Sequence, residues 1–405
     1  MTAEEKEKFL SNREHRIKAL WIGNFSLAFF LISSFGIGLF YLIKFFRLGF
    51  LQAVYENWPS MLLFLGLESL LFWSGIILVY VQSRQLGMKY RVIGILCGWI
   101  PIVHILALLV ILNVTFREAA FEHAKNQLDR ERLTQEICKT KYPLLMIHGV
   151  FFRDFKTFNY WGRVPNELML HGAEIYYGNH QSAASVKDSA KELAARIDEI
   201  LEESHCEKVN IIAHSKGGLD IKTAVSECNI ASKIASITTI NTPHQGCVFA
   251  DYLLNKAPLK FKEKVTAAYN SALHAMGDEN PDFISAVTDL TASHCAENWI
   301  ETGAFDYDAA GIFTQSFGSI LKKSGSGAFP LNFSYLFVKN FDGPNDGLVG
   351  EPSFHWGSRY TLLTPPEKRG ISHGDMIDLN RENIRGFDVR EFYVGVVADL
   401  KNRGF

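Results

Sequence analysis

Residues 209–218, with the sequence Val-Asn-Ile-Ile-Ala-His-Ser-Lys-Gly-Gly, decide the fold of this chain. A short apolar run of the kind that forms a buried β-strand ends at Ser215. The residues two positions before and after this serine, Ala213 and Gly217, are small. This pattern is typical of a nucleophile elbow, a sharp strand-to-helix turn that raises a serine hydroxyl above the edge of a sheet. A larger flanking side chain would collide with the neighbouring strand or helix. The pattern therefore predicts Ser215 as the residue that carries out the chemistry.

The segments around this turn alternate between strand and helix patterns. Buried strands are expected at 143–148, 173–177, 209–214 and 234–240. Helices are expected between them, at 165–171, 185–203 and 216–228. Such alternation indicates an α/β domain with a mostly parallel sheet covered on both faces. The order of strand, His-Gly loop, helix, strand, helix, strand, serine and helix fits an α/β-hydrolase core.

A nucleophilic serine needs a base and an acid that orients the base. In this fold the acid follows the serine and the histidine comes last, on loops after later strands. A further strand is expected at 333–339, and the turn 343–350, Gly-Pro-Asn-Asp-Gly-Leu-Val-Gly, follows it. Asp346 lies at the tip of this turn, so we expect it to be the acid. Asp342 and Glu351 are the neighbouring competitors.

The expected base lies further along the chain, in the segment 371–376, Ile-Ser-His-Gly-Asp-Met. His373 stands in this loop, before the last amphipathic segment. His355 competes with it, but it follows Asp346 too closely for another strand to fit between them. The order of the residues therefore favours Ser215, Asp346 and His373 as a catalytic triad.

The segment His148-Gly149-Val150 follows the first strand and supplies the remaining part of the site. A tetrahedral oxyanion requires two backbone N–H donors, one from the residue after the nucleophile and one from the loop after an early strand. These would be the amides of Lys216 and Val150. We expect His148 itself to pack or to form local hydrogen bonds.

The N-terminal third contains long runs without charge. No charged residue occurs at 19–43 or 92–116, and only Glu68 interrupts 58–83. Each run is about 25 residues, which is ~37 Å of helix against a hydrocarbon core of about 30 Å. Three transmembrane helices are therefore predicted. A cleaved signal peptide is the alternative for the first run, but that run is too long and two more follow it. Glu68 is expected to be hydrogen-bonded within the bundle, with His104 as a candidate partner.

The flanking positive charges predict an orientation. With three crossings, the loops on the N-terminal side carry Lys6, Lys8, Arg13, Arg16, Lys18, Arg84, Lys89 and Arg91. The loops on the other side carry Lys44, Arg47, Arg117, Lys125, Arg130 and Arg132. The positive-inside rule then predicts a multi-pass protein of the cell membrane with a cytoplasmic N-terminus and an extracytoplasmic catalytic domain.

The predicted domains are a membrane domain at 1–116, a charged helical stalk at 117–141 and a hydrolase domain at 142–405. The segment 117–141 could equally be the first helix of the hydrolase domain. The formal net charge of −2 gives no electrostatic reason to expect a nucleic acid partner. One cysteine of the six lies in a span, which leaves five without metal-type pairing, so no disulfide framework is expected.

From residue 142 to about 400 the chain resembles the bacterial triacylglycerol lipases of the true-lipase group. The matching pieces are IHGV at 147–150, NYWG at 159–162, AHSKGG at 213–218, ASITTINTPHQG at 235–246, GPNDGLVG at 343–350, SHGD at 372–375 and GFDVREFY at 386–393. The resemblance implies the same triad, with Ser215 as nucleophile, Asp346 as acid and His373 as base. It also implies the Val150 and Lys216 amides as oxyanion donors. The membrane-spanning third is not part of the secreted lipase pattern.

The resemblance also implies a structural calcium ion and a lid. In several such lipases an acidic residue two positions after the catalytic histidine binds calcium, and Asp375 occupies that place. Asp378 and Asn380 could add the oxygen ligands that calcium prefers. The alternative is that the Asp375 carboxylate simply anchors the histidine loop. An insertion at about 251–331 is expected to form a lid over an acyl pocket. Its candidate lid or pocket residues are Phe249, Tyr252, Leu253, Phe261, Ile312, Phe313 and Phe317.

The predicted function is that of a membrane-anchored serine carboxylester hydrolase that cleaves acyl esters of lipids such as triacylglycerol. Its expected partners are a lipid ester and the bilayer, and the chemistry requires no cofactor. A phospholipase or an acyltransferase would use the same triad with another head group or acceptor. A membrane sensor or scaffold whose hydrolase domain only binds lipid is the non-enzymatic alternative, which the intact set of catalytic residues disfavours.

Overall fold

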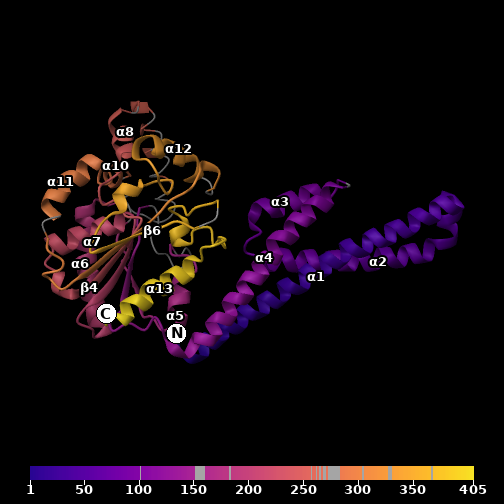
Figure 1. The fold of residues 1–405 in the computed structure, drawn as a ribbon, viewed down its shortest axis with the longest axis horizontal. Coiled ribbons are helices and arrows are strands. Elements are labelled where there is room, and N and C mark those ends of the chain that lie inside the picture. Colours follow the sequence, from indigo (N-terminus) through magenta and orange to yellow (C-terminus); the bar gives the residue numbers. More distant parts are fainter. Residues whose placement is uncertain are drawn as a thin grey trace. The chain divides into compact units, whose positions relative to one another are not determined.

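The computed structural model describes residues 1–100, 102–150, 160–181, 184–256, 258–260, 262–263, 266–267, 271, 283–302, 305–326, 331–365 and 368–405. The chain divides into two compact units, Met1–Leu133 and Thr134–Phe405 (Figure 1). Residues 117–132, expected in a stalk, continue the last long helix of the first unit. The predicted domain boundaries themselves stay predictions.

The N-terminal unit consists of helices. They are α1 (Ala3–Leu48), α2 (Phe50–Gln82), α3 (Gly87–Cys97) and α4 (Val103–Arg132), followed by the short turn η1 (Leu133–Gln135). Three helical segments are long and apolar enough to cross a membrane: Ala3–Leu48, Phe50–Gln82 and Val103–Gln135. The uncharged run 92–116 is divided between α3 and α4 rather than forming one helix.

Glu68 has a different partner from the one expected. Its Oε2 atom accepts a hydrogen bond from the Ser34 hydroxyl at 2.7 Å. His104 instead contacts a backbone oxygen of its own segment, the carbonyl of Ile100, at 3.3 Å. The expected Glu68–His104 pair is therefore wrong, because α1 packs along α2 and supplies the nearest hydroxyl. The Glu68 carboxylate is thus half-buried and hydrogen-bonded between α1 and α2.

The second unit contains one parallel sheet of six strands in the order β2-β1-β3-β4-β5-β6. The strands are β1 (Leu144–Ile147), β2 (Ile175–Tyr177), β3 (Val209–His214), β4 (Ile234–Ile240), β5 (Phe313–Ser319) and β6 (Arg359–Leu363). Every neighbouring pair in this list is parallel, which confirms the predicted fold class. Strands β1, β3 and β4 are buried along their whole length, as expected for strands covered on both faces.

Helices cover both faces of this sheet (Figure 1). The described helices of this unit are α5 (Val164–Leu170), α6 (Val186–Ser204), α7 (Lys216–Glu227), α8 (Val248–Lys256), α10 (Phe283–Thr288), α11 (Ala292–Thr302), α12 (Leu331–Asp342) and α13 (Val389–Asn402). Short 3-10 turns occur at η2 (Ala231–Lys233), η3 (Ser324–Ser326), η4 (Glu351–Phe354) and η5 (Asp375–Ile377). One apolar core joins the sheet to α5 and α13, and a second joins it to α6 and α7.

Two elements near the expected acid differ from the sequence-based prediction. The segment 333–339, expected as a strand, lies within helix α12, and residues 313–319, expected within the lid, form strand β5. In α12 the buried residues Tyr335 and Val338 are three positions apart, while Leu336 and Phe337 between them are exposed. This spacing is that of a helix, whereas a short apolar run in a sequence is compatible with either a strand or a helix.

Of the expected lid residues after position 300, Ile312 and Phe317 belong to the core of the second unit, and Phe313 is half-buried at the start of β5. Ile312 is 1% exposed and packs in the core with α6 and α7, and Phe317 of β5 packs against Ile240 and Phe392. Phe313 stacks on Phe405 with ring centres 5.5 Å apart. The predicted insertion therefore ends before Ile312, because its last part supplies a central strand.

The earlier expected lid residues lie on α8 or outside the described part of the chain. The rings of Phe249 and Tyr252 on α8 contact that of Phe341 on α12, with centres 5.8 and 4.8 Å apart. The Leu253 side chain and Phe261 lie outside the described residues. A lid role for α8 stays a prediction.

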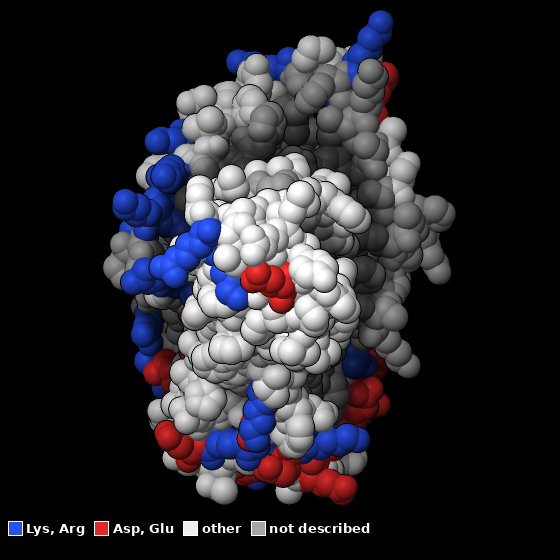
Figure 2. All heavy atoms as spheres, turned by 90° about the vertical axis from the view of Figure 1, so that its right-hand side faces the viewer, with Lys and Arg blue, Asp and Glu red and all other residues white. Residues whose placement is uncertain are grey.

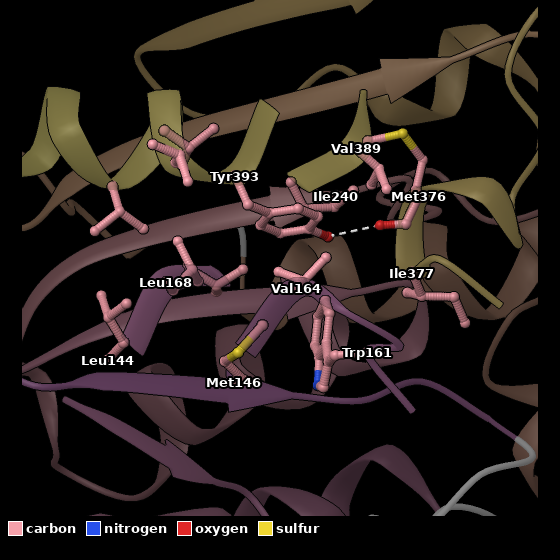
Figure 3. Packing of buried hydrophobic residues seen from close by; sticks show 14 of the residues in the cluster. Leu144, Met146, Trp161, Val164, Leu168, Ile240, Met376, Ile377, Val389 and Tyr393 are labelled. Atoms are coloured by element: carbon pink, nitrogen blue, oxygen red, sulfur yellow. Dashed lines mark hydrogen bonds between the residues drawn. The ribbon is translucent and has the colours of Figure 1, made fainter. Parts of the chain in front are cut away.

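In the second unit, a cluster of buried residues packs beneath the loop that carries His373 and holds this loop in place. Trp161, Tyr393 and Met376 come from three distant segments and meet there (Figure 3). Both aromatic rings are fully buried and lie edge to face, 5.9 Å apart. The Tyr393 hydroxyl donates a hydrogen bond to the Met376 carbonyl at 3.0 Å. Helix α13 thereby fixes the backbone that follows His373.

Candidate active site

Ser215 stands in a strained turn between β3 and α7. Its φ of 56° and ψ of −129° lie outside the regions that residues with a side chain prefer. A conformation of this kind costs on the order of 1–3 kcal/mol and persists only where its surroundings impose it. The Ser215 amide donates to the Ile240 carbonyl at 3.0 Å, which ties the turn to the end of β4. The geometry is that of the expected nucleophile elbow.

Close packing around the turn explains the small residues in the sequence. A Cβ atom on Gly149 would lie 2.7 Å from the Ser215 Cβ atom, and one on Gly217 would lie 2.5 Å from the His148 carbonyl oxygen. Ala213 is fully buried. The His-Gly loop after β1 therefore lies directly against the serine, which is possible only without a side chain at Gly149.

Asp346 and His373 form a hydrogen-bonded pair. The His373 Nδ1 atom lies 2.6 Å from the Asp346 Oδ2 atom, and the His373 amide donates to the Asp346 carbonyl at 2.9 Å. The other carboxylate oxygen, Oδ1, accepts from the amides of Leu348 and Val349 at 2.9 and 2.8 Å. Asp346 is fully buried and His373 is 7% exposed. Several donors thus hold the carboxylate in one orientation toward the imidazole.

The competing acids and the competing histidine have other roles. The Asp342 carboxylate accepts from the amides of Val248 and Phe249, at the start of α8. Glu351 contacts the Nε2 atom of His355 at 3.1 Å, and His355 is exposed. His355 lies before β6, as its position in the sequence implied.

Asn241 completes the support of Asp346, and the sequence did not point to it. It follows the last residue of β4, is fully buried and has a φ of 47°. Its amide nitrogen donates to the Asp346 Oδ2 atom at 2.6 Å and to the Ser319 hydroxyl at 2.7 Å. Its position directly after a buried strand, at the edge where the other site residues lie, is the signal that could have identified it.

His214 connects the elbow to the base. Its ring lies 4.5 Å from the His373 ring, centre to centre. Burial, followed by the positive charge that His373 can carry, holds the pKa of His214 well below its usual range. The Tyr160 hydroxyl contacts the His214 Nδ1 atom at 2.7 Å and accepts from the Gly149 amide at 3.0 Å. Tyr160 therefore positions both the residue before the nucleophile and the His-Gly loop.

The expected oxyanion donors flank the serine. Lys216 is the first residue of α7, so its amide has no acceptor within the helix. Its side chain is turned into the protein, where the ammonium group bonds to the Ser189 hydroxyl and the Asp220 carboxylate at 2.9 and 2.7 Å. Val150 is 8% exposed and follows Gly149, which packs against Ser215. The start of α7 and the loop that carries Val150 therefore both adjoin the nucleophile, and the role of the two amides as oxyanion donors stays a prediction.

His148 packs locally, as expected. Its ring stacks on that of His180 at 4.1 Å, and its Nδ1 atom lies 2.9 Å from the Gly149 carbonyl oxygen. Burial, with His180 second, lowers the pKa of His148 well below its usual range. A neutral imidazole in this place stabilises the loop and is not poised as the base.

The two carboxylates expected to bind calcium are both held by arginines. Arg369 donates to both Asp375 oxygens, at 3.1 and 3.2 Å, and the Ser372 amide donates to Oδ2. Arg163 donates to both Asp378 oxygens at 2.8 Å. A cation would have to displace these guanidinium groups, so the residues as arranged do not fit a calcium ion. In this arrangement Asp375 anchors the histidine loop.

The chain is similar in sequence to several triacylglycerol lipases. It is 30% identical to that of Pseudarthrobacter phenanthrenivorans over 169 residues, which are 39% of this chain and 52% of that one. It is also 30% identical to that of Burkholderia plantarii over 169 residues, 39% of this chain and 47% of that one. With that of Pseudomonas fragi it is 26% identical over 302 residues, 65% of this chain and 98% of that one. The chain spans about half the length of the first two relatives.

No family model matches the chain. Among solved structures, it is similar to the mature lipase BlEst2 of Bacillus licheniformis, with 21% identity and a TM-score of 0.45, over 60% of this chain and 88% of that one. The sequence similarities agree with the parallel sheet and with the strained serine turn. The chain is thus similar in sequence to triacylglycerol lipases, and its parallel sheet covered by helices, with a serine in a strained strand-to-helix turn, is the α/β arrangement predicted from the sequence.

Proposed function

We propose that this protein is a membrane-anchored serine hydrolase that cleaves acyl esters of lipids, with triacylglycerol as the first substrate to test. The observation that carries the proposal is the buried Asp346–His373 pair, whose imidazole lies beside the ring of His214, the residue directly before Ser215 in its strained turn. The similarity to triacylglycerol lipases supports the substrate class. The three long apolar helices support the anchoring.

The proposed reaction begins with attack of the Ser215 hydroxyl on the ester carbonyl carbon. With His373 Nδ1 bonded to Asp346, the Nε2 atom is the one left to take the serine proton. The Asp346 carboxylate stabilises the imidazolium that forms. The oxyanion accepts hydrogen bonds from the Val150 and Lys216 amides. The imidazolium returns its proton to the departing alcohol, and water then attacks the acyl-serine to release the fatty acid.

The neutral state of His214 favours this reaction. A protonated His214 would place a second positive charge 4.5 Å from the His373 ring and oppose formation of the imidazolium. Burial keeps the pKa of His214 low enough for it to stay neutral. Only one of the two adjacent imidazoles is therefore set to gain a proton.

Fluorophosphonate labelling of the full-length protein in detergent tests the nucleophile. Wild type is expected to be labelled, and Ser215→Ala is expected to lose the label. Ser226→Ala is the matched control, because Ser226 lies on α7 and its hydroxyl bonds only to carbonyls of that helix. Unlabelled wild type, or labelled Ser215→Ala, would contradict the proposal. Release of fatty acid from triacylglycerol, compared with release from phospholipid, tests the substrate.

A further inference from the structure

Helices α1 and α2 form a hairpin with an apolar surface. Gly23 and Gly75 bring the two helices together, since a Cβ atom on Gly75 would lie 3.0 Å from the Gly23 carbonyl oxygen. The turn between them is at Gly49, whose φ is 79°. Large apolar side chains such as Phe29, Ile32 and Phe35 are more than half exposed along α1. Such a surface is stable only in an apolar surrounding, and its length fits a bilayer.

Helices α3 and α4 form a second, shorter hairpin. A Cβ atom on Gly94 would lie 2.9 Å from the Ile111 Cδ1 atom, so the middle of α3 packs on the apolar part of α4. The turn lies between Cys97 and Val103, the last and first residues of the two helices. From Val103 to the first charge at Arg117 there are 14 residues, or ~21 Å of helix, less than a hydrocarbon core of about 30 Å. In Figure 1 the α1–α2 hairpin extends beyond the α3–α4 turn.

The two ends of the second hairpin meet at one polar cluster. The Arg91 guanidinium, just before the apolar part of α3, donates to the Ser83 carbonyl at 2.7 Å. The Ser83 hydroxyl and the Arg84 amide donate to Glu118, just after the apolar part of α4, at 2.5 and 2.9 Å. The segment just before the uncharged run 92–116 and the segment just after it therefore lie side by side, at the same end of the helices. A helix that crossed the bilayer would separate them by its full thickness.

The N-terminus of α1 belongs to the same polar end. Arg16 bonds to Glu118 at 2.8 Å, and Arg13 bonds to Asp129 at 2.5 Å. Further from the charged end, the Thr115 hydroxyl donates to Asn24 at 2.6 Å. These contacts show α4 running antiparallel to α1, with its charged half beside the charged start of α1.

From these contacts we infer that α3 and α4 dip into the bilayer and return, so that the chain crosses it twice and the hydrolase domain lies on the cytoplasmic side with the N-terminus. The chain enters the hydrolase unit directly after α4, at Thr134. Twelve Lys and Arg residues of the first unit then lie on one side: Lys6, Lys8, Arg13, Arg16, Lys18, Arg84, Lys89, Arg91, Arg117, Lys125, Arg130 and Arg132. Only Lys44 and Arg47 lie at the α1–α2 turn. Such an asymmetry places the larger group in the cytoplasm.

The surface of the N-terminal unit agrees with this arrangement. In Figure 2, which shows the right-hand side of Figure 1, the middle of the view is uncharged except for one small group of charged side chains, and further charged side chains lie along the lower edge. With two crossings the hydrolase domain lies on the side of the membrane opposite to that expected from three crossings, because the charges after α4 are then on the same side as the N-terminus. Together with the proposed function, on which this step rests, the arrangement implies that the substrates are acyl esters in or next to the cytoplasmic leaflet.

The test maps three positions in the full-length protein, expressed in a bacterial host. One short epitope tag is placed before Met1, at Gly49 or after Phe405, and antibody access is compared in intact spheroplasts and in opened cells. The Gly49 position is suitable because open space surrounds it. The expected result is access to the Gly49 tag in intact spheroplasts and to both terminal tags only after opening.

Two outcomes would overturn the inference. Access to the C-terminal tag but not the N-terminal tag in intact spheroplasts would show an odd number of crossings. Access to both terminal tags there, with the Gly49 tag protected, would reverse the side. The same tags in Ser215→Ala are expected to give the same pattern, so the result is independent of catalysis. Fluorophosphonate labelling of the tagged proteins reports on the proposed function separately.

Discussion

The two units of this protein hold their buried polar residues in different ways. In the hydrolase unit, Asn241, Asp346 and His373 come from distant parts of the chain and meet where parallel strands end, and the Ser215 amide bonds to Ile240, the residue before Asn241. In the helical unit, Glu118 and its partners gather at one end of long apolar helical segments. The sheet brings its polar groups together at the ends of its strands, whereas the helices hold theirs at the charged ends of long apolar segments. Substitutions in each unit test this difference.

Asp346→Asn is expected to have the largest effect. An amide cannot stabilise the imidazolium and favours the wrong tautomer of the histidine, so kcat is expected to fall about 10⁴-fold. Ester hydrolysis by the full-length protein in detergent measures it. Asp342→Asn is the matched control, since that carboxylate binds the start of α8 and is expected to leave kcat within a few fold. Equal losses in both variants would argue against Asp346 as the acid.

Arg163→Met is expected to lower stability the most. It leaves the buried Asp378 carboxylate without its ion pair, which costs about 3–5 kcal/mol in comparable cases. Thermal unfolding measured with and without a calcium chelator checks it. Arg163→Met/Asp378→Asn is expected to recover part of the loss, and the chelator is expected to leave wild-type activity unchanged. Loss of activity with the chelator, restored by calcium, would show that a cation does replace these arginine contacts.

Glu118→Gln tests the polar end of the helical unit. The carboxylate accepts from Arg16, the Ser83 hydroxyl and two backbone amides. A glutamine has one acceptor oxygen and turns an NH₂ group toward donors, so a loss of about 1.5–3 kcal/mol is expected. Resistance to heat and protease in detergent measures it. Glu14→Gln, at a more exposed carboxylate, is expected to change little. An unaffected Glu118 variant would mean that the cluster does not hold the helices together.

Asn241→Gly tests the positioning of Asp346. Glycine accepts the φ of 47°, so this variant removes the amide without straining the backbone. Loss of a hydrogen bond to a charged group predicts a fall in kcat of about 10- to 100-fold with little change in KM. Asn241→Ala is expected to lose the same activity and, in addition, about 1 kcal/mol of stability. An unchanged kcat for the glycine variant would leave Asn241 with a structural role only.

Lys222→Met is expected to have the smallest effect, on the pH dependence of stability. Burial lowers the pKa of Lys222 to about 8, below its usual 10.5. Between these values the unfolded chain holds a proton that the folded protein has released, so stability rises with pH there. The variant is expected to lose this rise. At neutral pH the variant is expected to be about 1 kcal/mol more stable than wild type, because it removes a buried charge. Loss of the contact between the ammonium group and the Trp356 ring offsets part of this gain. A rise that persists in Lys222→Met would assign it to another group.

Much of the hydrolase unit could be predicted from the sequence because its signals are local. The strands at 209–214 and 234–240 and the helix after Ser215 were expected with their observed bounds to within a residue or so. Residues 333–339, expected as a strand, form part of a helix, and residues 313–319, which fall within the lid insertion expected at about 251–331, form a strand. The first segment is short and apolar and the second is mostly polar, so neither pattern identifies its conformation, which packing against the sheet decides for the helix and pairing within the sheet decides for the strand.

By itself the sequence determined which residue types are available and in what order: a serine between small residues, a later acid, a later histidine and long uncharged helices. Only the tertiary structure decided which groups meet. It paired Asp346 with His373, added Asn241 and Tyr160, and gave Asp375 and Asp378 to arginines. It also folded the run 92–116 back on itself. The reason is physical. Hydropathy and turn residues act over a few positions, whereas contacts across a sheet edge or between helices join residues that lie far apart in the chain.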